Sequence, residues 1–166
     1  MKRNLKKYTC LGALAWAVCL GSLNAVAGFA FANDSAGLGS FVSPHFHPIA
    51  KRGDHVFVAN TPNNTLDVIH AKSLEKDTEI SVGIDPVRVA IRPDGLEIWV
   101  SNHISDSISV IDNDPNSLTH WNVVATIQAF DDKLATSFDE PVGIAFASND
   151  KAYVALSSEN QIACLL

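Results

Sequence analysis

Cysteine is scarce, and its distribution excludes two kinds of covalent chemistry. The chain has 3 cysteines in 166 residues, and Cys10 and Cys19 lie in its basic, apolar N-terminal segment. Only Cys164 is left in the remainder, so no internal disulfide can form there. No CxxCH sequence is present either, which excludes c-type haem attachment within this chain. We therefore predict no cofactor for this chain.

Positive charge is also scarce once the N-terminal segment is set aside. The chain has 12 Lys and Arg residues against 18 Asp and Glu residues. Four of the basic residues lie in the first seven positions, whereas every acidic residue lies at Asp34 or later. The remainder has eight basic against eighteen acidic residues, a net charge of −10. An acidic surface repels phosphate backbones, so we expect no nucleic-acid partner.

Catalytic motifs are missing as well. Serine is plentiful, but the sequence contains no Gly-x-Ser-x-Gly nucleophile turn and no glycine-rich loop that could cradle a phosphate. These absences leave the question of enzymatic activity open, with the balance toward a protein that is not an enzyme.

The segment 1–32 is typical of a secretory signal peptide. Basic residues begin the chain, an apolar run follows over Leu11–Leu20, and small-x-small cleavage sites end at Ala27 and Ala32. The run is too short to span a bilayer comfortably, so no stable membrane span is expected after cleavage. An uncleaved anchor is the alternative. We therefore predict export to the periplasm or the extracellular space, with residues 33–42 as a mobile lead-in.

Three short apolar runs within residues 82–112 predict β-strands. They are Val87–Ile91, Ile98–Ser101 and Ile108–Ile111, and turn formers such as Pro93-Asp94-Gly95 separate them. Runs of this length, rich in β-branched and aromatic residues and bounded by breakers, are typical of strands. No window repeats apolar residues at helical spacing, which disfavours helix.

The same pattern occurs three times. Shifted upstream by 42 positions, Pro86, Trp99 and Asn102 align with Pro44, Phe57 and Asn60. Downstream, Pro86 aligns with Pro141 at an offset of 55, and Trp99 aligns with Tyr153 at an offset of 54. A period of about 40–50 residues with several strands per unit is typical of β-propeller blades.

The repeat resembles the YVTN repeat of bacterial β-propeller proteins. Its aromatic-Val-small-Asn core is present at residues 57–60 and 99–102, whereas residues 153–156 end in Leu156 instead of Asn. The resemblance covers residues 43–166. It implies an all-β propeller of four-stranded antiparallel blades, here about two and a half blades in an incomplete ring. Blade 1 is 43–84, blade 2 is 85–140, and partial blade 3 is 141–166.

The strands expected in the first blade are Phe46–Ala50, His55–Ala59, Thr65–His70 and Thr78–Val82, and Val123–Gln128 is expected as the fourth strand of the second.

A closed propeller has at least four blades, and four blades as long as the first would not fit between positions 33 and 166. We therefore expect the N-terminal part of a larger protein. Alone, it would expose one blade face and tend to self-associate.

Five residues are candidates for ligand binding at the channel mouth of such a propeller. Asp85 and Glu140 each precede a repeat proline, and Arg88 lies just inside the strand that follows. His45 and His47 are two apart on a predicted strand, so both would point to one face, as metal ligands or as an ordinary packed pair. The alternative for the charged residues is a role as turn formers in solvent.

No metal site is predicted. Asp112-x-Asp114-x-Asn116 resembles the start of a calcium loop, but Ser117 stands where such a loop has glycine and Val123 where it has a bidentate Glu. A β-turn explains this segment better.

Fold and motifs together favour a binding or interaction scaffold whose partner is a protein or cell-envelope material. Propellers host both enzymes and recognition modules, so the fold does not decide between them. One alternative is the propeller part of a larger periplasmic enzyme or electron-transfer protein with catalytic or haem motifs beyond Leu166. Another is a surface or adhesion protein with further repeats.

Overall fold

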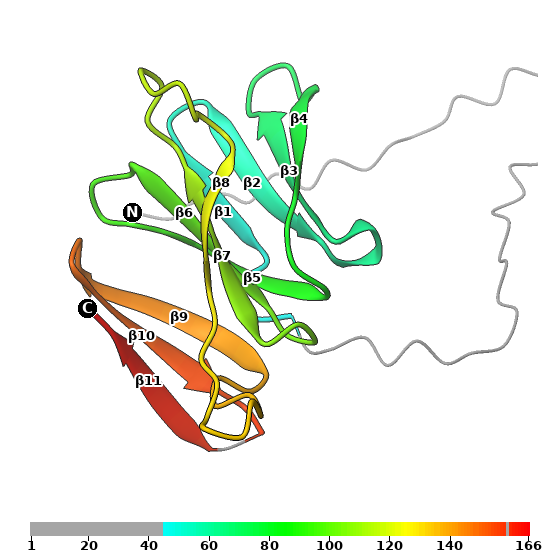
Figure 1. Cartoon of the computed structure of the whole chain (residues 1–166). Helices are drawn as coiled ribbons and strands as arrows, with labels where there is room; N and C mark the ends of the chain where they lie inside the picture. Colours follow the sequence, from blue (N-terminus) through cyan, green and yellow to red (C-terminus); the bar gives the residue numbers. More distant parts are fainter. Residues whose placement is uncertain (1–44, 159) are drawn as a thin grey trace, which may run out of the picture. The chain divides into compact units, whose positions relative to one another are not determined.

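The structure is a computed structural model that describes residues 45–158 and 160–166. These residues form eleven β-strands and one short 3-10 turn, Thr61–Asn63 (Figure 1). The expected signal peptide and lead-in lie outside the described residues. Within the described part of the chain, no helix has the length and apolar character needed to cross a membrane.

The first sheet contains four antiparallel strands in sequence order: β1 (Ile49–Arg52), β2 (His55–Asn60), β3 (Thr65–His70) and β4 (Lys76–Ser81). Alternation along the strands puts Phe57, Leu66 and Val68 on one face, where each is at most 1% exposed. That face packs against the second sheet in one apolar cluster.

The second sheet repeats this order with β5 (Pro86–Ile91), β6 (Glu97–Asn102), β7 (Ser107–Asp112) and β8 (Val123–Ile127). Both of its faces are apolar because both are covered. Ile98 and Val100 join the cluster shared with the first sheet, whereas Ile108 and Val110 join a second cluster shared with the third sheet. This double burial explains why Ile98-Trp99-Val100 in β6 is a continuous apolar run instead of a strict alternation.

The third sheet has three strands, β9 (Pro141–Ser148), β10 (Lys151–Leu156) and β11 (Gln161–Leu165), with β10 in the centre (Figure 1). In each sheet the first strand contacts its counterpart in the next, since β5 contacts both β1 and β9. The arrangement is all-β, with successive antiparallel blades around a shared inner side and an incomplete ring. Pro86 and Pro141 begin equivalent inner strands, and Pro44 lies outside the described residues.

The prediction of a strand from Phe46 is wrong, because β1 begins only at Ile49. His47 has a φ of 56°, in the left-handed region that strands do not use, and Pro48 follows it. Phe46 and His47 instead pair with β5: the Phe46 N–H donates to the Val87 carbonyl at 3.2 Å, and the Val89 N–H donates to the His47 carbonyl at 3.2 Å. His45 and His47 therefore do not share a strand face.

The repeated Asn forms side-chain hydrogen bonds with the third strand in each of the first two blades. The Asn102 side chain, fully buried, donates to Ser107 Oγ at 3.1 Å and to Ser109 Oγ at 3.0 Å. Asn60 likewise donates to Asp67 Oδ2 at 3.2 Å. In the third blade the position of Asn102 is occupied by Leu156, which is 4% exposed and joins an apolar cluster. The third copy of the repeat thus replaces a polar network with apolar packing.

Candidate binding site at the channel mouth

The backbone N–H of the residue before Pro86, and that of the residue before Pro141, donates to a side chain in the loop between the second and third strands of the preceding sheet. The Asp85 N–H donates to Asn64 Oδ1, and the Glu140 N–H donates to Asp106 Oδ1, both at 2.9 Å. All four residues have positive φ, a conformation that Asn and Asp tolerate better than most other non-glycine residues. These hydrogen bonds fix the backbone positions of Asp85 and Glu140, and therefore the points from which their side chains extend.

Glu140 lies in a cavity of about 570 Å³ at the mouth end of blades 2 and 3, which is lined by His45, Phe46, His103, Glu140, Val142 and Ser157. Ser157 Oγ donates to Glu140 Oε2 at 3.1 Å, and His103 Nε2 lies 3.9 Å from the same oxygen. The His103 ring is mostly buried, and its Nδ1 has no hydrogen-bond partner among the described residues. We call this cavity the mouth cavity.

His45 is anchored at the edge of the mouth cavity. Its Nε2 lies 2.5 Å from Thr61 Oγ1, and that hydroxyl donates to the Pro86 carbonyl at 2.8 Å. The 3-10 turn after β2 thus connects the histidine to the start of β5, so His45 has a defined position although it is exposed.

Arg88 and His47 belong to a second cavity of about 520 Å³ along the inner strands. Arg88 Nη2 donates to the Ile144 carbonyl at 3.0 Å, and Nη1 donates to the Phe46 carbonyl at 3.5 Å. Burial lowers the pKa of the guanidinium from its ordinary value. Because that value is far above neutrality, Arg88 stays positively charged. We call this cavity the wall cavity; its other lining residues are Ile49, Ala50, Val89, Ala90, Ile91, Pro93, Ile144, Ala145 and Phe146.

Phe46 lines the mouth cavity and contacts two residues of the wall cavity. Its ring lies 5.3 Å beneath the Arg88 guanidinium carbon and meets the His47 ring edge-on at 4.4 Å, yet the residue remains 53% exposed. A Cβ added at Gly143 would lie 4.0 Å from the Phe46 ring, which places the ring against β9. The site therefore has an exposed aromatic centre, a carboxylate on one side and a guanidinium on the other.

Of the five residues predicted from the sequence, four lie around Phe46: His45 and Glu140 in the mouth cavity, His47 and Arg88 in the wall cavity. Asp85 does not join them. It is 7% exposed, and its Oδ2 has no hydrogen-bond partner in the described part of the chain.

Sequence reasoning missed His103 and Ser157. Each directly follows the second strand of its blade, and each donates its backbone N–H to the residue before a repeat proline: His103 to the Asp85 carbonyl at 2.9 Å, Ser157 to the Glu140 carbonyl at 3.1 Å. The repeat alignment that pairs Trp99 with Tyr153 also pairs these two positions, so the signal was present in the sequence.

The mouth cavity is suited to recognition more than to nucleophilic chemistry. Ser157 Oγ donates to the backbone carbonyl and to the carboxylate of Glu140, each at 3.1 Å, and not to an imidazole that could remove its proton.

Among the described residues, no cluster of three or more His, Cys, Asp or Glu side chains is placed to hold a metal ion. Asp112 Oδ1 and Asp114 Oδ1 accept backbone N–H groups two residues ahead, as turn residues do.

No protein-family model matches the chain, and no curated protein matches it. Among solved structures, it is similar to hydrazine synthase of Kuenenia stuttgartiensis, with 23% identity, a TM-score of 0.58, and coverage of 77% of this chain and 35% of that chain. It is also similar to a putative 6-phosphogluconolactonase from Bacteroides uniformis, with 20% identity, a TM-score of 0.53, and coverage of 70% and 37%.

A third similar structure is the dihydro-heme d1 dehydrogenase NirN, with 21% identity, a TM-score of 0.50, and coverage of 69% of this chain and 22% of that chain. The chain thus spans between about a fifth and two fifths of the length of these structures. At such identities the likeness concerns the fold alone. The three antiparallel blades and these matches together show that the chain has the β-propeller fold.

Proposed function

We propose that this chain is an exported β-propeller scaffold that binds a ligand at its channel mouth. The observation that carries the proposal is a cavity of about 570 Å³ lined by the exposed Phe46, together with a cavity of about 520 Å³ lined by Arg88 and His47, whose side chains contact the Phe46 ring. Cavities of this size, with apolar walls and a few convergent polar groups, are typical of ligand sites. The channel end of a propeller is built from loops on a rigid sheet, which suits recognition.

The ligand that best fits these groups is a short peptide segment, from a protein or from cell-envelope material. Glu140 and the two imidazoles of the mouth cavity can bind a basic or hydrogen-bond-donating group, and the Phe46 ring can pack against an apolar stem. The Arg88 guanidinium can bind a carbonyl or carboxylate at the other end. The net charge of −10 beyond the N-terminal segment favours a ligand that carries positive charge.

This proposal is tested by titrating the full chain with two probe peptides, acetyl-Phe-Lys-amide and acetyl-Phe-Glu-amide, and following backbone amide resonances by NMR. We expect saturable shifts at residues 45–47, 103, 140 and 142 with the lysine peptide, and a preference for it over the glutamate peptide. The E140Q variant should lose that preference.

The matched control is E75Q, which makes the same chemical change in the exposed turn between β3 and β4. It should bind like the wild type. Equal shifts with both peptides, or shifts outside the mouth, would overturn the assignment of this site.

A second candidate is that the chain is the propeller part of a larger periplasmic enzyme or electron-transfer protein. The observation in its favour is the coverage of the structural matches, since the match covers 35% of the hydrazine synthase chain and 22% of the NirN chain. Reading the DNA downstream of the Leu166 codon tests it. A continuing frame with a CxxCH motif would support this candidate, whereas further repeats followed by an anchor would favour a surface protein.

A further inference from the structure

A pocket of about 340 Å³ lies between blades 1 and 2, at the opposite end of the strands from the mouth cavity. Its residues come from the β1–β2 turn, the β5–β6 turn and the β7–β8 loop, which the antiparallel topology puts at one end of the two sheets. The mouth cavity instead includes His103 of the β6–β7 loop, and the two sites share no residue. We call this pocket the rear pocket.

Arg52 extends from blade 1 to blade 2 and is held there by the β5–β6 turn. Its Nη2 donates to the Asp94 carbonyl at 2.7 Å, and its Nη1 donates to the Pro93 carbonyl at 3.5 Å. The guanidinium lies directly on Gly95, where an added Cβ would be 2.4 Å from Cζ and Nε. Gly95 also has a φ of 81°, so both the turn and the arginine require glycine at this position.

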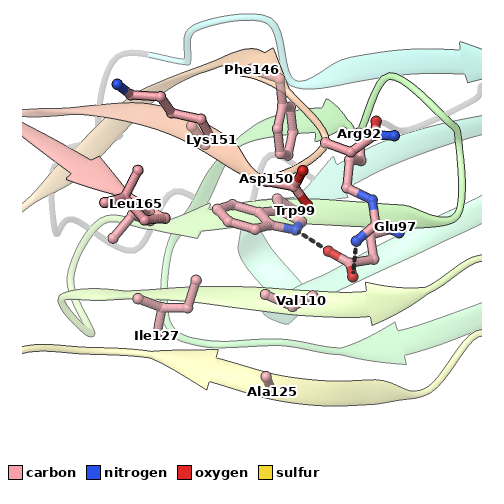
Figure 2. Close-up of a pocket in the computed structure, with 13 residues that line it drawn as sticks. Arg92, Glu97, Trp99, Val110, Ala125, Ile127, Phe146, Asp150, Lys151 and Leu165 are labelled. Carbon is pink, nitrogen blue, oxygen red and sulfur yellow. Dashed lines mark hydrogen bonds and ion pairs between the residues drawn. The ribbon is translucent and has the colours of Figure 1, made fainter.

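The positive charge of Arg52 is not neutralised by a carboxylate. Among the described residues it forms no ion pair. The neighbouring Asp94 carboxylate is already bound, because Arg92 Nε donates to both of its oxygens at 3.0 Å. Arg92 also donates to Glu97, a contact drawn in Figure 2. Since the two carbonyl contacts use only part of its fork of N–H groups, Arg52 brings free donors to the rear pocket.

The amide oxygen in the rear pocket is already occupied. Asn113 Oδ1 accepts the Trp121 Nε1–H at 3.2 Å, and Asn113 Nδ2 donates to the Gly95 carbonyl at 2.8 Å. By contrast, His120 Nδ1 is buried and has no hydrogen-bond partner in the described part of the chain. This nitrogen can donate in the tautomer that protonates it. Arg52 and His120 thus offer unused donors, which call for a ligand that accepts hydrogen bonds.

Rings and apolar side chains form the rest of the rear pocket. The His120 ring stacks on Trp121 at 4.5 Å, and the His55 ring meets Trp121 edge-on at 5.1 Å. Leu96, 41% exposed, and Pro115 add apolar surface beside the indole. Because Asn113 bonds both Trp121 and the β5–β6 turn, this wall is fixed relative to the guanidinium.

We propose that the rear pocket binds the carboxylate of a small organic acid whose apolar body packs against Trp121. The planar fork of Arg52 matches a carboxylate through two parallel hydrogen bonds, and His120 can supply a further N–H. A pocket of about 340 Å³ is at the lower end of the range for ligand sites, so a small ligand is expected. The carboxylate can belong to a free acid or to the C-terminus of a peptide.

The test titrates the full chain with 3-phenylpropionate and with its neutral isostere 3-phenylpropanamide, and follows the Trp121 Nε1–H resonance by NMR. We expect a saturable shift with the acid and binding of the amide that is weaker by about tenfold or more, because only the acid forms charge-assisted hydrogen bonds with Arg52. Equal binding of the two compounds, or no shift of the Trp121 resonance, would overturn the proposal.

Three variants locate the charge that matters. R52Q should weaken binding of the acid by about tenfold or more, and R52K, which keeps the charge without the planar fork, should recover only part of that loss. The matched control is K51Q, which removes the same charge from the adjacent residue of β1, whose side chain points to the other face. It should bind like the wild type. If R52Q and K51Q weaken binding equally, the pocket is not the site; the comparison of acid and amide on the wild type remains decisive even if R52Q does not fold.

Two further probes define the ligand. Inorganic phosphate tests the role of the apolar body, and binding as tight as that of 3-phenylpropionate would contradict it. Acetyl-Ala-Phe with a free C-terminus separates the two sources of the carboxylate: tighter binding than that of 3-phenylpropionate supports a peptide C-terminus, and weaker binding supports a free acid. E140Q should bind 3-phenylpropionate like the wild type, because the rear pocket is independent of the mouth cavity.

Discussion

Replacement of Asn102 by alanine should be among the most destabilising single changes in the second blade. Asn102 is fully buried, and its amide is the shared donor to Ser107 Oγ and Ser109 Oγ. Ser107 keeps a partner in the variant because its hydroxyl also lies 2.9 Å from Ser105 Oγ. Ser109, which is 3% exposed, has no such second partner among the side-chain hydrogen bonds of the described residues.

The magnitude follows from these contacts. Two hydrogen bonds at about 1 kcal/mol each are lost, and the orphaned Ser109 hydroxyl adds a desolvation penalty of about 1 kcal/mol or more. N102A should therefore lower the free energy of unfolding by about 3 kcal/mol. The double variant N102A/S109A removes the orphan and should recover about 1 kcal/mol of that loss.

Equilibrium urea unfolding of the full chain, followed by tryptophan fluorescence, measures both values. The third blade already shows the paired change, because Leu156 and Ala163 occupy the places of Asn102 and Ser109 in one apolar cluster. The reasoning is refuted if N102A unfolds with the same free energy as the wild type, or if adding S109A lowers stability further.

Three further predictions concern other parts of the fold. G83A should lower the free energy of unfolding by about 1–3 kcal/mol in the same urea assay, because its Cβ would lie 2.6 Å from the buried Asn102 amide; an unchanged midpoint would contradict this. The Arg92 guanidinium holds the pKa of Asp94 below its ordinary value of 3.8, so the stabilising ion pair is present above that value and is lost as pH falls through the lower folded pKa. Carboxyl NMR should show the Asp94 midpoint below 3.8, and R92Q should raise it. Finally, the open face of the third blade, with Ile162 73% exposed, should drive self-association in sedimentation velocity, and I162K should reduce it; a monomeric wild type would oppose this.

The blades could be predicted from the sequence because their signals are local. The apolar run at residues 108–111 and the turn formers around it specify β7, and the repeated Asn marks the end of β2 and β6. Short strands between strong breakers require no knowledge of distant contacts. The structure also explains why the third copy of the repeat ends in Leu156 instead of Asn, since Leu156 packs in an apolar cluster where the first two blades have a polar network.

The parts that sequence reasoning missed depend on long-range contacts. The residues around His47 form an alternating polar and aromatic pattern typical of a strand, but Pro48 and the pairing of this segment with β5 give it another path. Trp121 lies in a long polar loop, and nothing local indicates that its ring packs against the apolar cluster of the first two sheets. Asp85 and Glu140 hold equivalent places in the repeat, yet Glu140 lines the mouth cavity whereas Asp85 is buried at 7% exposure, and nothing local in the sequence distinguishes the two.

The most direct test of the central claim, binding at the channel mouth, is site-specific photo-crosslinking in cells that export the protein. Benzoylphenylalanine at position 46 would place the reactive group in the mouth cavity, beside Arg88 and His47 of the wall cavity, in an aromatic side chain that is already 53% exposed. The same group at Leu74, 78% exposed in the turn between β3 and β4, is the control. We expect a discrete cross-linked product from position 46 and none from position 74. No product from position 46, or the same product from both positions, would contradict it.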